Sequence, residues 1–338
     1  MTSPIKRYCE LSESHNYISG DRAKAREAII QKILPNAEMV NVPCPCGNDP
    51  AESIPLAYID RWGLPATMVL CTTCGLIRID PRWDDNTYAR IYEQYFWPLQ
   101  VGFFDITRER FDLSVRRAAL FAQFLKTHIE LTGKSLLEIG CRYGAGLTSI
   151  KDTGAELTGY DYDERCLGYG RSFTGLNLKL GGIKEAVTEG KQYDVIVLRH
   201  VLEHFLNPFE ECLLLKSLLK ENGTMFVEVP GIFNLKDVGN DPLMYFNVFH
   251  TFSFSLINMS HLMNACSFKL TYGDEQILSL WIKAKEEFEV NWPEPNLSKK
   301  IRNFLLQMEM EREKTIKSSN RIVNKIFDLL KRIKKPRG

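Results

Sequence analysis

The stretch that decides the fold is LLEIGCRYGAG at residues 136–146. It begins as a buried strand, and the glycines at 140, 144 and 146 predict a tight turn that opens into a helix. Glycine lets the backbone approach a ligand closely, because no Cβ atom stands in the way. Asp161 follows 21 residues after Gly140, where the next expected strand ends. These two strand ends predict a ligand site at the carboxyl edge of a parallel sheet.

Short apolar segments alternate with helical patterns around this turn, which favours an α/β fold. The expected strands are 135–139, 157–160, 176–180, 194–198, 224–229, 268–272 and 277–284. The expected helices between them are 145–152, 163–171, 208–220 and 256–265. We therefore predict a Rossmann-like, mostly parallel seven-stranded sheet with helices on both faces.

The flanking segments predict further units. Helices are expected at 20–33, 84–95 and 105–131, and a region rich in Pro, Gly and Cys separates the first two. The predicted division is an N-terminal helical segment (1–40), a small cysteine-rich lobe (41–82), a helical connector or lid (83–132), the sheet domain (133–286) and a basic helical tail (287–338).

Composition and charge exclude several classes of protein. The chain has 338 residues, 44% of them hydrophobic and 25% charged, which is ordinary for a globular protein. No apolar run is long enough to span a bilayer, and the N-terminus has no secretory pattern, so we expect a cytoplasmic protein whose nine cysteines are reduced or metal-bound. Residues 296–338 carry a net charge of +9 and the remainder −8. The body shows no basic groove, and we expect no nucleic-acid partner.

Two classes of ligand fit the glycine turn, a dinucleotide or a nucleoside without phosphates. The dinucleotide fingerprint is G-x-G-x-x-G, and here Arg142 stands in place of its second glycine. A pyrophosphate needs a close approach to the backbone, so this replacement disfavours a dinucleotide. Glu138 would also repel a phosphate but could meet a cation. A glycine turn without a ligand remains the third reading.

The segments LLEIGCRYGAGL, GYD, YDVIVLRHVLEHFLNPFE and LKENGTMFVEVP together resemble those of the class I S-adenosylmethionine-dependent methyltransferases over about residues 130–285. The resemblance implies that Gly140, Cys141 and Gly144 in the turn contact the cofactor S-adenosylmethionine and that Asp161 holds its ribose. Glu138 would support the turn. Arg142 departs from the family's usual glycine, which leaves the geometry of the turn open.

The fourth expected strand is followed by Arg199, His200, Glu203 and His204. In the family this stretch lines the cofactor pocket, which implies a cofactor contact for Arg199 and a catalytic position for His200. His250, in an aromatic segment, would face the substrate as a general base, because an imidazole titrates near neutral pH. For each histidine, a purely structural role is the alternative.

Two cysteine pairs, Cys44/Cys46 and Cys71/Cys74, are each followed by glycine. Four thiolates on two tight turns suit a closed, structural Zn²⁺ site, which has no catalytic position. Four buried cysteines without metal are the alternative.

A cysteine-rich N-terminal lobe before such a domain resembles methyltransferases with an N-terminal zinc-binding domain, many of which act on sugars or polysaccharide precursors. Their sugar C-methyltransferases carry His-Glu-His where this chain has Val248-Phe249-His250, so we expect O-methylation of a sugar or surface-glycan precursor. C-methylation of a nucleotide-linked deoxysugar, a non-catalytic scaffold and a nicotinamide-dependent oxidoreductase are the alternatives. Tyr92, Tyr95 and Trp97 would line the substrate side or dock the zinc lobe.

The basic tail places Ile322, Ile326, Leu329, Leu330 and Ile333 on one helical face. Such a helix predicts peripheral contact with an anionic membrane, pairing with a second tail in a homodimer, or packing on its own domain.

Overall fold

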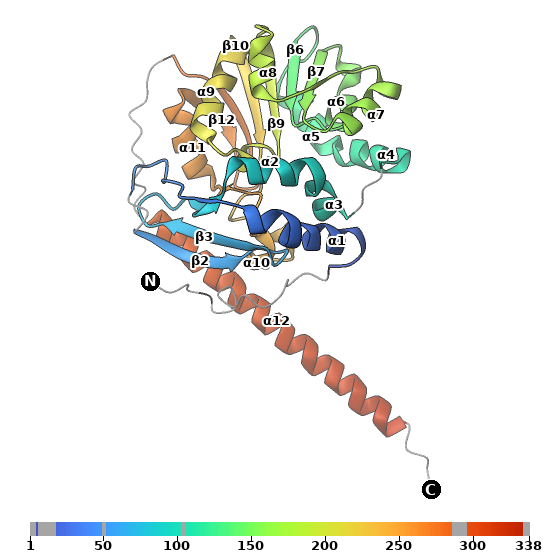
Figure 1. The fold of residues 1–338 in the computed structure, drawn as a ribbon, viewed down its shortest axis with the longest axis vertical. Coiled ribbons are helices and arrows are strands. Elements are labelled where there is room, and N and C mark those ends of the chain that lie inside the picture. Colours follow the sequence, from blue (N-terminus) through green and yellow to red (C-terminus); the bar gives the residue numbers. More distant parts are fainter. Residues whose placement is uncertain (1–4, 6–17, 49–51, 103–105, 286–295, 334–338) are drawn as a thin grey trace.

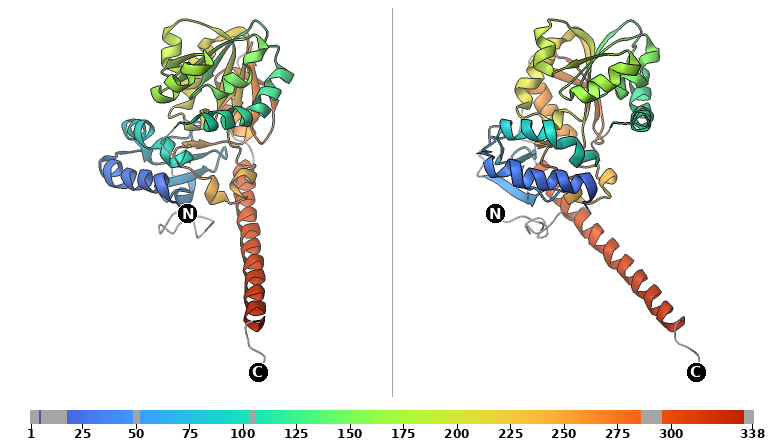
Figure 2. Two further views of the ribbon diagram at one scale, coloured as in Figure 1. Left: turned by 90° about the vertical axis from the view of Figure 1, so that its right-hand side faces the viewer. Right: turned by 45° about the vertical axis from the view of Figure 1, so that its right-hand side comes forward.

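The computed structural model describes Ile5 and residues 18–48, 52–102, 106–285 and 296–333. A large α/β lobe lies above a smaller N-terminal lobe, and one long helix, α12, leaves the body beside the smaller lobe (Figures 1 and 2). The seven strands expected from the sequence all form, and they make one sheet.

The large sheet is mixed, because one of its strands runs against its neighbours. Its spatial order is β12-β13-β10-β9-β6-β7-β8. Neighbours from β10 to β8 pair in parallel, whereas β13 is antiparallel to both β10 and β12. The strands are β6 Ser135–Ile139, β7 Glu156–Asp161, β8 Asn177–Leu180, β9 Tyr193–Arg199, β10 Leu219–Glu228, β12 Phe268–Gly273 and β13 Leu278–Lys283. The order turns from β6 outward in both directions, so the ends of β6, β7 and β9 form a crevice.

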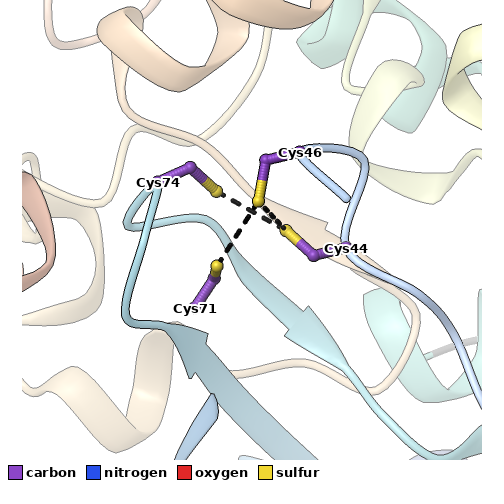
Figure 3. A group of neighbouring side chains, drawn as sticks. All are labelled: Cys44, Cys46, Cys71 and Cys74. Carbon is purple, nitrogen blue, oxygen red and sulfur yellow. Dashed lines mark hydrogen bonds between the residues drawn. The ribbon is translucent and has the colours of Figure 1, made fainter. Parts of the chain in front are cut away.

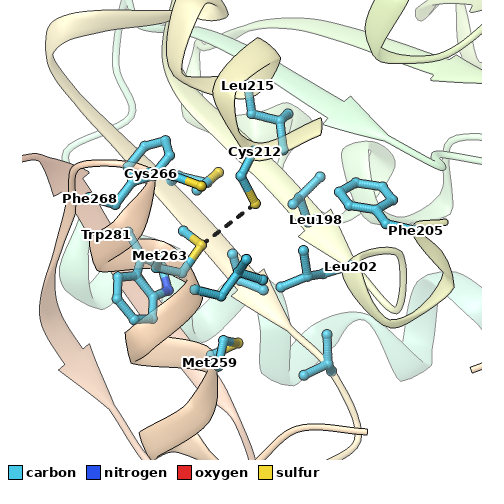
Figure 4. Close-up of a cluster of buried hydrophobic side chains, with 14 of the residues drawn as sticks. Leu198, Leu202, Phe205, Cys212, Leu215, Met259, Met263, Cys266, Phe268 and Trp281 are labelled. Atoms are coloured by element: carbon cyan, nitrogen blue, oxygen red, sulfur yellow. Dashed lines mark hydrogen bonds between the residues drawn. The ribbon is translucent and has the colours of Figure 1, made fainter. Parts of the chain in front are cut away.

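Helices cover both faces of this sheet, as predicted. One face packs on α5, α6 and α7, and the other on α8, α9 and α11. Alternate residues of β6 serve the two cores, with Leu136 in the first and Leu137 in the second, as the two-residue period of a strand requires. In the second core Cys212, Met263, Cys266 and Trp281 pack together (Figure 4). The helices are α5 Ala119–His128, α6 Ala145–Ser149, α7 Glu164–Thr174, α8 Ile183–Thr188, α9 Pro208–Leu218 and α11 Leu256–Ala265, with the short 3-10 turns η5 Lys151–Thr153 and η6 Leu202–His204.

The N-terminal lobe is a small antiparallel sheet with helices packed on it. Its order is β11-β4-β3-β2, and β1 pairs separately with β5. The strands are β1 Met39–Val40, β2 Ser53–Ile59, β3 Pro65–Cys71, β4 Ile77–Ile79, β5 Arg82–Trp83 and β11 Phe252–Ser253. The helical elements are α1 Gly20–Ala28, η2 Ile29–Ile33, η3 Leu34–Asn36, α2 Asp85–Gln94 and α3 Phe96–Val101.

Distant segments complete the core of the smaller lobe. Strand β11 comes from within the range expected for the sheet domain, and it pairs with β4. Side chains from 232–249 and from the start of α12 share one hydrophobic cluster with β2, β3 and α1. This segment includes η7 Lys236–Val238 and α10 Pro242–Tyr245. The two lobes are therefore joined by packing as well as by the chain.

The single helix expected at 105–131 is wrong. The described part forms α4 Arg108–Arg117 and then α5, with a break at Ala118, where ψ is −1°. The break lets α4 and α5 pack on two different surfaces. Phe111 of α4 packs on Tyr143, whereas Phe121 and Leu125 of α5 pack on the sheet. Leu120 lies between these surfaces and is 78% exposed.

Helix α12 spans Leu297–Ile333. Of its described side chains, only those at the beginning of the helix pack in the core of the smaller lobe, through Leu297, Ile301 and Leu305. The apolar face expected at Ile322 to Ile333 lies outside the described side chains. Within the described ranges no helix combines the length and apolar character needed to cross a membrane. The expected peripheral membrane contact gains no support.

Candidate active-site cleft

A cleft of about 2560 Å³ lies between the carboxyl ends of the large sheet and the elements α2 and α3 of the smaller lobe. Both groups of residues singled out in the sequence line it. Most of the glycine turn, Glu138 and Asp161 lie on its wall, and so do Arg199, His200, Glu203, His204 and His250. Gly144 does not line the cleft, because the place of its missing Cβ faces Leu176 and Leu178. The cleft therefore brings together segments that are more than 100 residues apart.

The turn after β6 takes the shape that its glycines predict. Gly140 and Gly144 have φ values of 73° and 78°, in the left-handed region that glycine enters most easily. The N–H groups of Gly140 and Cys141 both donate to the carbonyl of Tyr160, at 2.8 and 3.1 Å. The thiol of Cys141 is buried beneath the turn. Its carbonyl oxygen accepts from the Gly144 N–H at 2.8 Å, so both backbone polar groups of Cys141 bond within the fold, and its contact with a cofactor stays a prediction.

Arg142 keeps the geometry of the turn although it is not glycine. Its φ is 54°, so it adopts the left-handed conformation itself. Its N–H donates to Asp161 Oδ2 at 2.8 Å, and its guanidinium lies 3.8 Å from the ring centre of Trp97 and 4.5 Å from that of Tyr143. Trp97 belongs to α3, so this stack also links the turn to the smaller lobe.

Asp161 stands at the end of β7 with both oxygens organised by the backbone. Oδ2 accepts from Arg142 N–H and Oδ1 from Asp163 N–H at 2.9 Å. Each carboxylate oxygen can accept a second hydrogen bond, so two acceptors remain for hydroxyl groups. Burial raises the pKa of Asp161 above its ordinary value, despite these two backbone hydrogen bonds.

Glu138, at the end of β6, is buried and only partly compensated. Its Oε1 lies 3.8 Å from Arg199 Nη1, whereas Oε2 has no hydrogen-bond partner among the described residues. Burial raises the pKa of Glu138 to about 7, although the charge of Arg199 opposes this. Arg199 also donates to Glu228 Oε2 at 3.2 Å. A buried carboxylate with an unused oxygen, facing a cleft, suits a cationic ligand.

Gly146 leaves the room that this arrangement needs. A Cβ atom there would lie 2.7 Å from Glu138 Oε1 and 2.9 Å from Arg199 Nη1. The third glycine of the turn is therefore required by side-chain packing rather than by backbone conformation.

Directly after β9, His200 and Glu203 face each other. His200 has a φ of 54° and a side chain that is 54% exposed. Its Nδ1 lies 3.5 Å from Glu203 Oε1, and its Nε2 lies 3.8 Å from Glu228 Oε1. Enclosure lowers the pKa of His200, but the two carboxylates outweigh this effect and leave it above its ordinary value.

His204 and His250 stand behind this pair. Their rings meet edge to face with centres 4.9 Å apart. His204 Nδ1 lies 2.8 Å from the Phe249 carbonyl oxygen and 2.8 Å from the Tyr92 hydroxyl. Burial lowers the pKa of His204 and lowers that of His250 well below its ordinary value. Burial therefore favours the neutral form of both rings.

Comparison with known proteins agrees with the resemblance read from the sequence. Residues 108–270 match the family described as "Methyltransferase domain". This part of the chain, just under half of its length, is therefore similar to methyltransferase domains.

The curated relatives that the chain matches include several proteins named ubiquinone biosynthesis O-methyltransferase. That of Azoarcus sp. (strain BH72) is 32% identical over 111 residues, which cover 29% of this chain and 45% of the relative. That of Glaesserella parasuis serovar 5 is 33% identical over 107 residues, which cover 29% and 45%. The chain thus spans about half the length of the curated relatives it matches.

Solved structures of methyltransferases are similar to part of this chain. The plantazolicin methyltransferase BpumL in complex with SAH has 19% identity and a TM-score of 0.43, with 52% of this chain and 88% of that chain covered. The magnesium protoporphyrin IX methyltransferase ChlM from Synechocystis PCC 6803 with bound SAM has 15% identity and a TM-score of 0.42, with 60% and 98% covered.

The smaller lobe closes the cleft with aromatic and polar side chains. Tyr92, Tyr95 and Trp97 all pack against the core of the lobe, and Tyr92 and Trp97 also line the cleft. Arg61 also lines it and donates to Gln100 Oε1 at 2.7 Å. Periodicity of single helices could not reveal this wall, because it forms only when α3 and the β2–β3 turn meet.

Glu228 is a further cleft residue that the sequence reasoning missed. It ends β10 and contacts both Arg199 and His200. The sequence could have predicted Glu228, because it is a charged residue at the carboxyl end of a buried strand. The same pattern identified Glu138 and Asp161.

The four cysteines predicted as metal ligands meet in the smaller lobe (Figure 3). The Sγ atom of Cys44 lies 3.3 Å from that of Cys46 and 3.5 Å from that of Cys74, and Cys46 Sγ lies 3.6 Å from Cys71 Sγ. Zn–S bonds of about 2.3 Å in a tetrahedron place sulfurs about 3.8 Å apart. The donor set therefore fits a structural zinc ion with little movement.

Proposed function

We propose that the chain transfers the methyl group of S-adenosylmethionine to a hydroxyl oxygen of a sugar or glycan precursor. The observation that carries this proposal is the cleft itself, in which a glycine turn and two strand-end carboxylates face a group of imidazoles. Bound there, S-adenosylmethionine supplies an electrophilic methyl group on a sulfonium sulfur.

On the cofactor side, Asp161 would accept hydrogen bonds from the ribose hydroxyls, and Glu138 with its unused oxygen would face the cationic methionine end. Tyr162 and Leu180 lie in the cleft wall and are 72% and 55% exposed, which is unusual for large apolar side chains. We assign them to the two faces of the adenine ring, because an apolar ring and an aliphatic side chain can cover a flat base.

On the substrate side, the chain's main task is to align the hydroxyl oxygen with the methyl carbon and the sulfur. His200 is placed to accept the hydroxyl proton, because its ring is exposed in the cleft and its raised pKa makes it a stronger base than an ordinary imidazole. His250, the base expected from the sequence, is more deeply enclosed and is a weaker one.

The substrate class rests on the wall contributed by the smaller lobe. Trp97, Tyr92, Arg61 and Gln100 offer aromatic faces together with hydrogen-bond donors. A sugar presents apolar C–H faces and hydroxyl groups, which such a wall can bind. The names of the curated relatives favour a second candidate, a phenolic hydroxyl on a quinone precursor.

The zinc ion belongs to the same proposal as a structural element. Four thiolates would hold it beside β3 and β4, and the N-terminal lobe would then carry Trp97 and Tyr92 to the cleft in a fixed position.

The test is to incubate the zinc-replete full chain with S-adenosylmethionine and either a nucleotide-linked sugar panel or a catechol panel, and to measure S-adenosylhomocysteine. We expect turnover with a sugar and a large loss of rate in His200→Gln, with S-adenosylhomocysteine still bound. Turnover with catechols alone would show that the substrate carries a phenolic hydroxyl rather than a sugar hydroxyl. Failure to bind S-adenosylmethionine would contradict the activity and favour the scaffold alternative.

A further inference from the structure

We propose that Glu203, His204 and His250 form a second metal site, separate from the cysteine cluster, which binds one divalent first-row cation in the wall of the cleft. Each residue offers one ligand atom, and these atoms lie within 4.8 Å of one another. The set of two imidazoles and one carboxylate is typical of sites for metals such as Mn²⁺ and Fe²⁺ that keep open coordination positions.

The first observation is the carboxylate of Glu203, which is 2% exposed. Neither of its oxygens has a hydrogen-bond partner among the described residues. Burying a carboxylate that accepts no hydrogen bond costs on the order of several kcal/mol of solvation free energy, unless a cation compensates the charge. His200 Nδ1, at 3.5 Å, faces only Oε1, and the position of Glu203 in the cleft wall lets a cation reach its carboxylate.

The second observation is the orientation of His204. A carbonyl oxygen can only accept, so the 2.8 Å contact with Phe249 places the hydrogen on Nδ1 and the lone pair on Nε2. The Nε2 atom that carries this lone pair lies 3.9 Å from Glu203 Oε1, so two electron-rich atoms are close together. Histidines that bind metals usually donate their other N–H to a carbonyl or carboxylate in this way.

The third observation is access. His250 brings the second imidazole to the same place, with its ring centre 4.9 Å from that of His204. All three residues line the cleft, so a bound cation would keep positions open toward a substrate. Tyr92 and Phe96 pack against His204 and hold it in place.

Two positive groups nearby oppose the cation. A protonated His200 would pair with Glu203 at 3.5 Å, and Arg61 lies close enough to lower the pKa values of His204 and His250. Glu228, 3.8 Å from His200, offers that imidazole a second partner when the metal takes Glu203. We therefore expect reversible binding rather than a permanently held ion.

The role of this metal rests on the proposed function. A hydroxyl bound to a divalent cation loses its proton more readily, because the metal stabilises the oxyanion. With Glu203 bound to the cation, Glu228 at 3.8 Å is the carboxylate left to favour a proton on His200. The O–H bond would break with its proton passing to His200, and the oxygen would form the new bond to the methyl carbon as the carbon–sulfur bond breaks. The metal would also set the position of the nucleophile.

The experiment is a titration of the zinc-replete full chain with Mn²⁺, followed by the loss of the free-ion signal in electron paramagnetic resonance. Mn²⁺ is the probe because thiolates bind it poorly, so the cysteine cluster does not compete. We expect one Mn²⁺ per chain, bound at least about tenfold more weakly in Glu203→Gln and in His250→Ala, as expected when a metal-site residue is lost. His128→Ala, at the exposed end of α5, is the matched control and should bind as the natural chain does.

Each outcome decides the proposal. Folding of both variants is checked by S-adenosylhomocysteine binding and by thermal unfolding, and either folded variant suffices. No Mn²⁺ binding, or binding that neither variant weakens, overturns the metal site. Mn²⁺ binding without methyl transfer to any substrate would leave the site standing and contradict the proposed function instead, whereas transfer at a rate independent of Mn²⁺ would refute the metal's role.

Discussion

The backbone N–H of Arg142 donates a 2.8 Å hydrogen bond to Oδ2 of Asp161, which ties the glycine turn after β6 to the acidic end of β7. The two features are therefore one unit rather than two neighbouring contacts. A residue that kept φ near 54° would preserve this bond, and one that moved out of the left-handed region would break it.

Two substitutions of Arg142 separate the effect of its backbone conformation from the effect of its side chain. Arg142→Gly and Arg142→Ala both lose the stack on Trp97. Alanine, unlike glycine, is still destabilised by the left-handed backbone conformation at this position. We expect Arg142→Gly to be the more stable of the two by about 1 kcal/mol. Urea unfolding of both variants measures this difference, and an alanine variant as stable as the glycine variant would show that the turn has relaxed.

Gly146 should be intolerant of even one methyl group. In Gly146→Ala the new Cβ would press on Glu138 and Arg199, at 2.7 and 2.9 Å. We expect S-adenosylhomocysteine to bind about tenfold more weakly, equivalent to about 1.4 kcal/mol. Gly168→Ala in α7 is the matched control, because its nearest neighbour would be 3.9 Å away. That variant should bind normally and be slightly more stable, and equal losses in both variants would contradict this role for Gly146.

Removal of zinc should loosen the smaller lobe. We expect Cys71→Ser to lose bound zinc, measured by elemental analysis, and to unfold at a lower temperature, because metal binding contributes to folding free energy. Cys212→Ala, in the core between the sheet and α11, serves as the comparison. It should lower stability through a cavity yet keep its zinc. Zinc content unchanged in Cys71→Ser would argue against the four-cysteine site.

Glu138 should make cofactor binding depend on pH. Burial raises its pKa to about 7, so the free protein holds a proton there at about pH 6 that the unfolded chain, with a carboxyl pKa near 4.3, does not. The contribution of Glu138 to stability therefore falls as pH rises from about 4 to about 7. The cationic cofactor favours the ionised form, so its affinity should rise over the upper part of this range and level off above it.

Calorimetry with S-adenosylmethionine at about pH 6 and about pH 8 measures this effect. We expect tighter binding at the higher pH and no such change in Glu138→Gln, whose side chain does not titrate. An equal pH dependence in this variant would assign the effect to another group, such as Asp161.

Local patterns predicted most of the large lobe. Strand β6 and helix α11 begin and end as expected. The strand is a short segment buried at every position and followed by Gly140, and Ser255 caps the first turn of the helix. The break at Ala118 was missed because the segment is helical on both sides of it. Only the separate partners of Phe111 and Phe121 require it.

The site was predicted in part for the same reason. Strand ends marked Glu138 and Asp161, and the spacing of the cysteines marked their cluster. The stack of Trp97 on Arg142 and the meeting of His204 with His250 depend on contacts between distant segments, which no local pattern contains.

The most direct test of the account is calorimetric titration of the zinc-replete full chain with S-adenosylmethionine, beside Asp161→Ala and the exposed control Asp152→Asn. We predict binding at a single site, at least about tenfold weaker in Asp161→Ala and unchanged in Asp152→Asn, since a charged hydrogen bond contributes about 1.5–3 kcal/mol. A folded chain that binds no S-adenosylmethionine, or binds it equally in all three forms, would contradict the assignment of this cleft as the cofactor site.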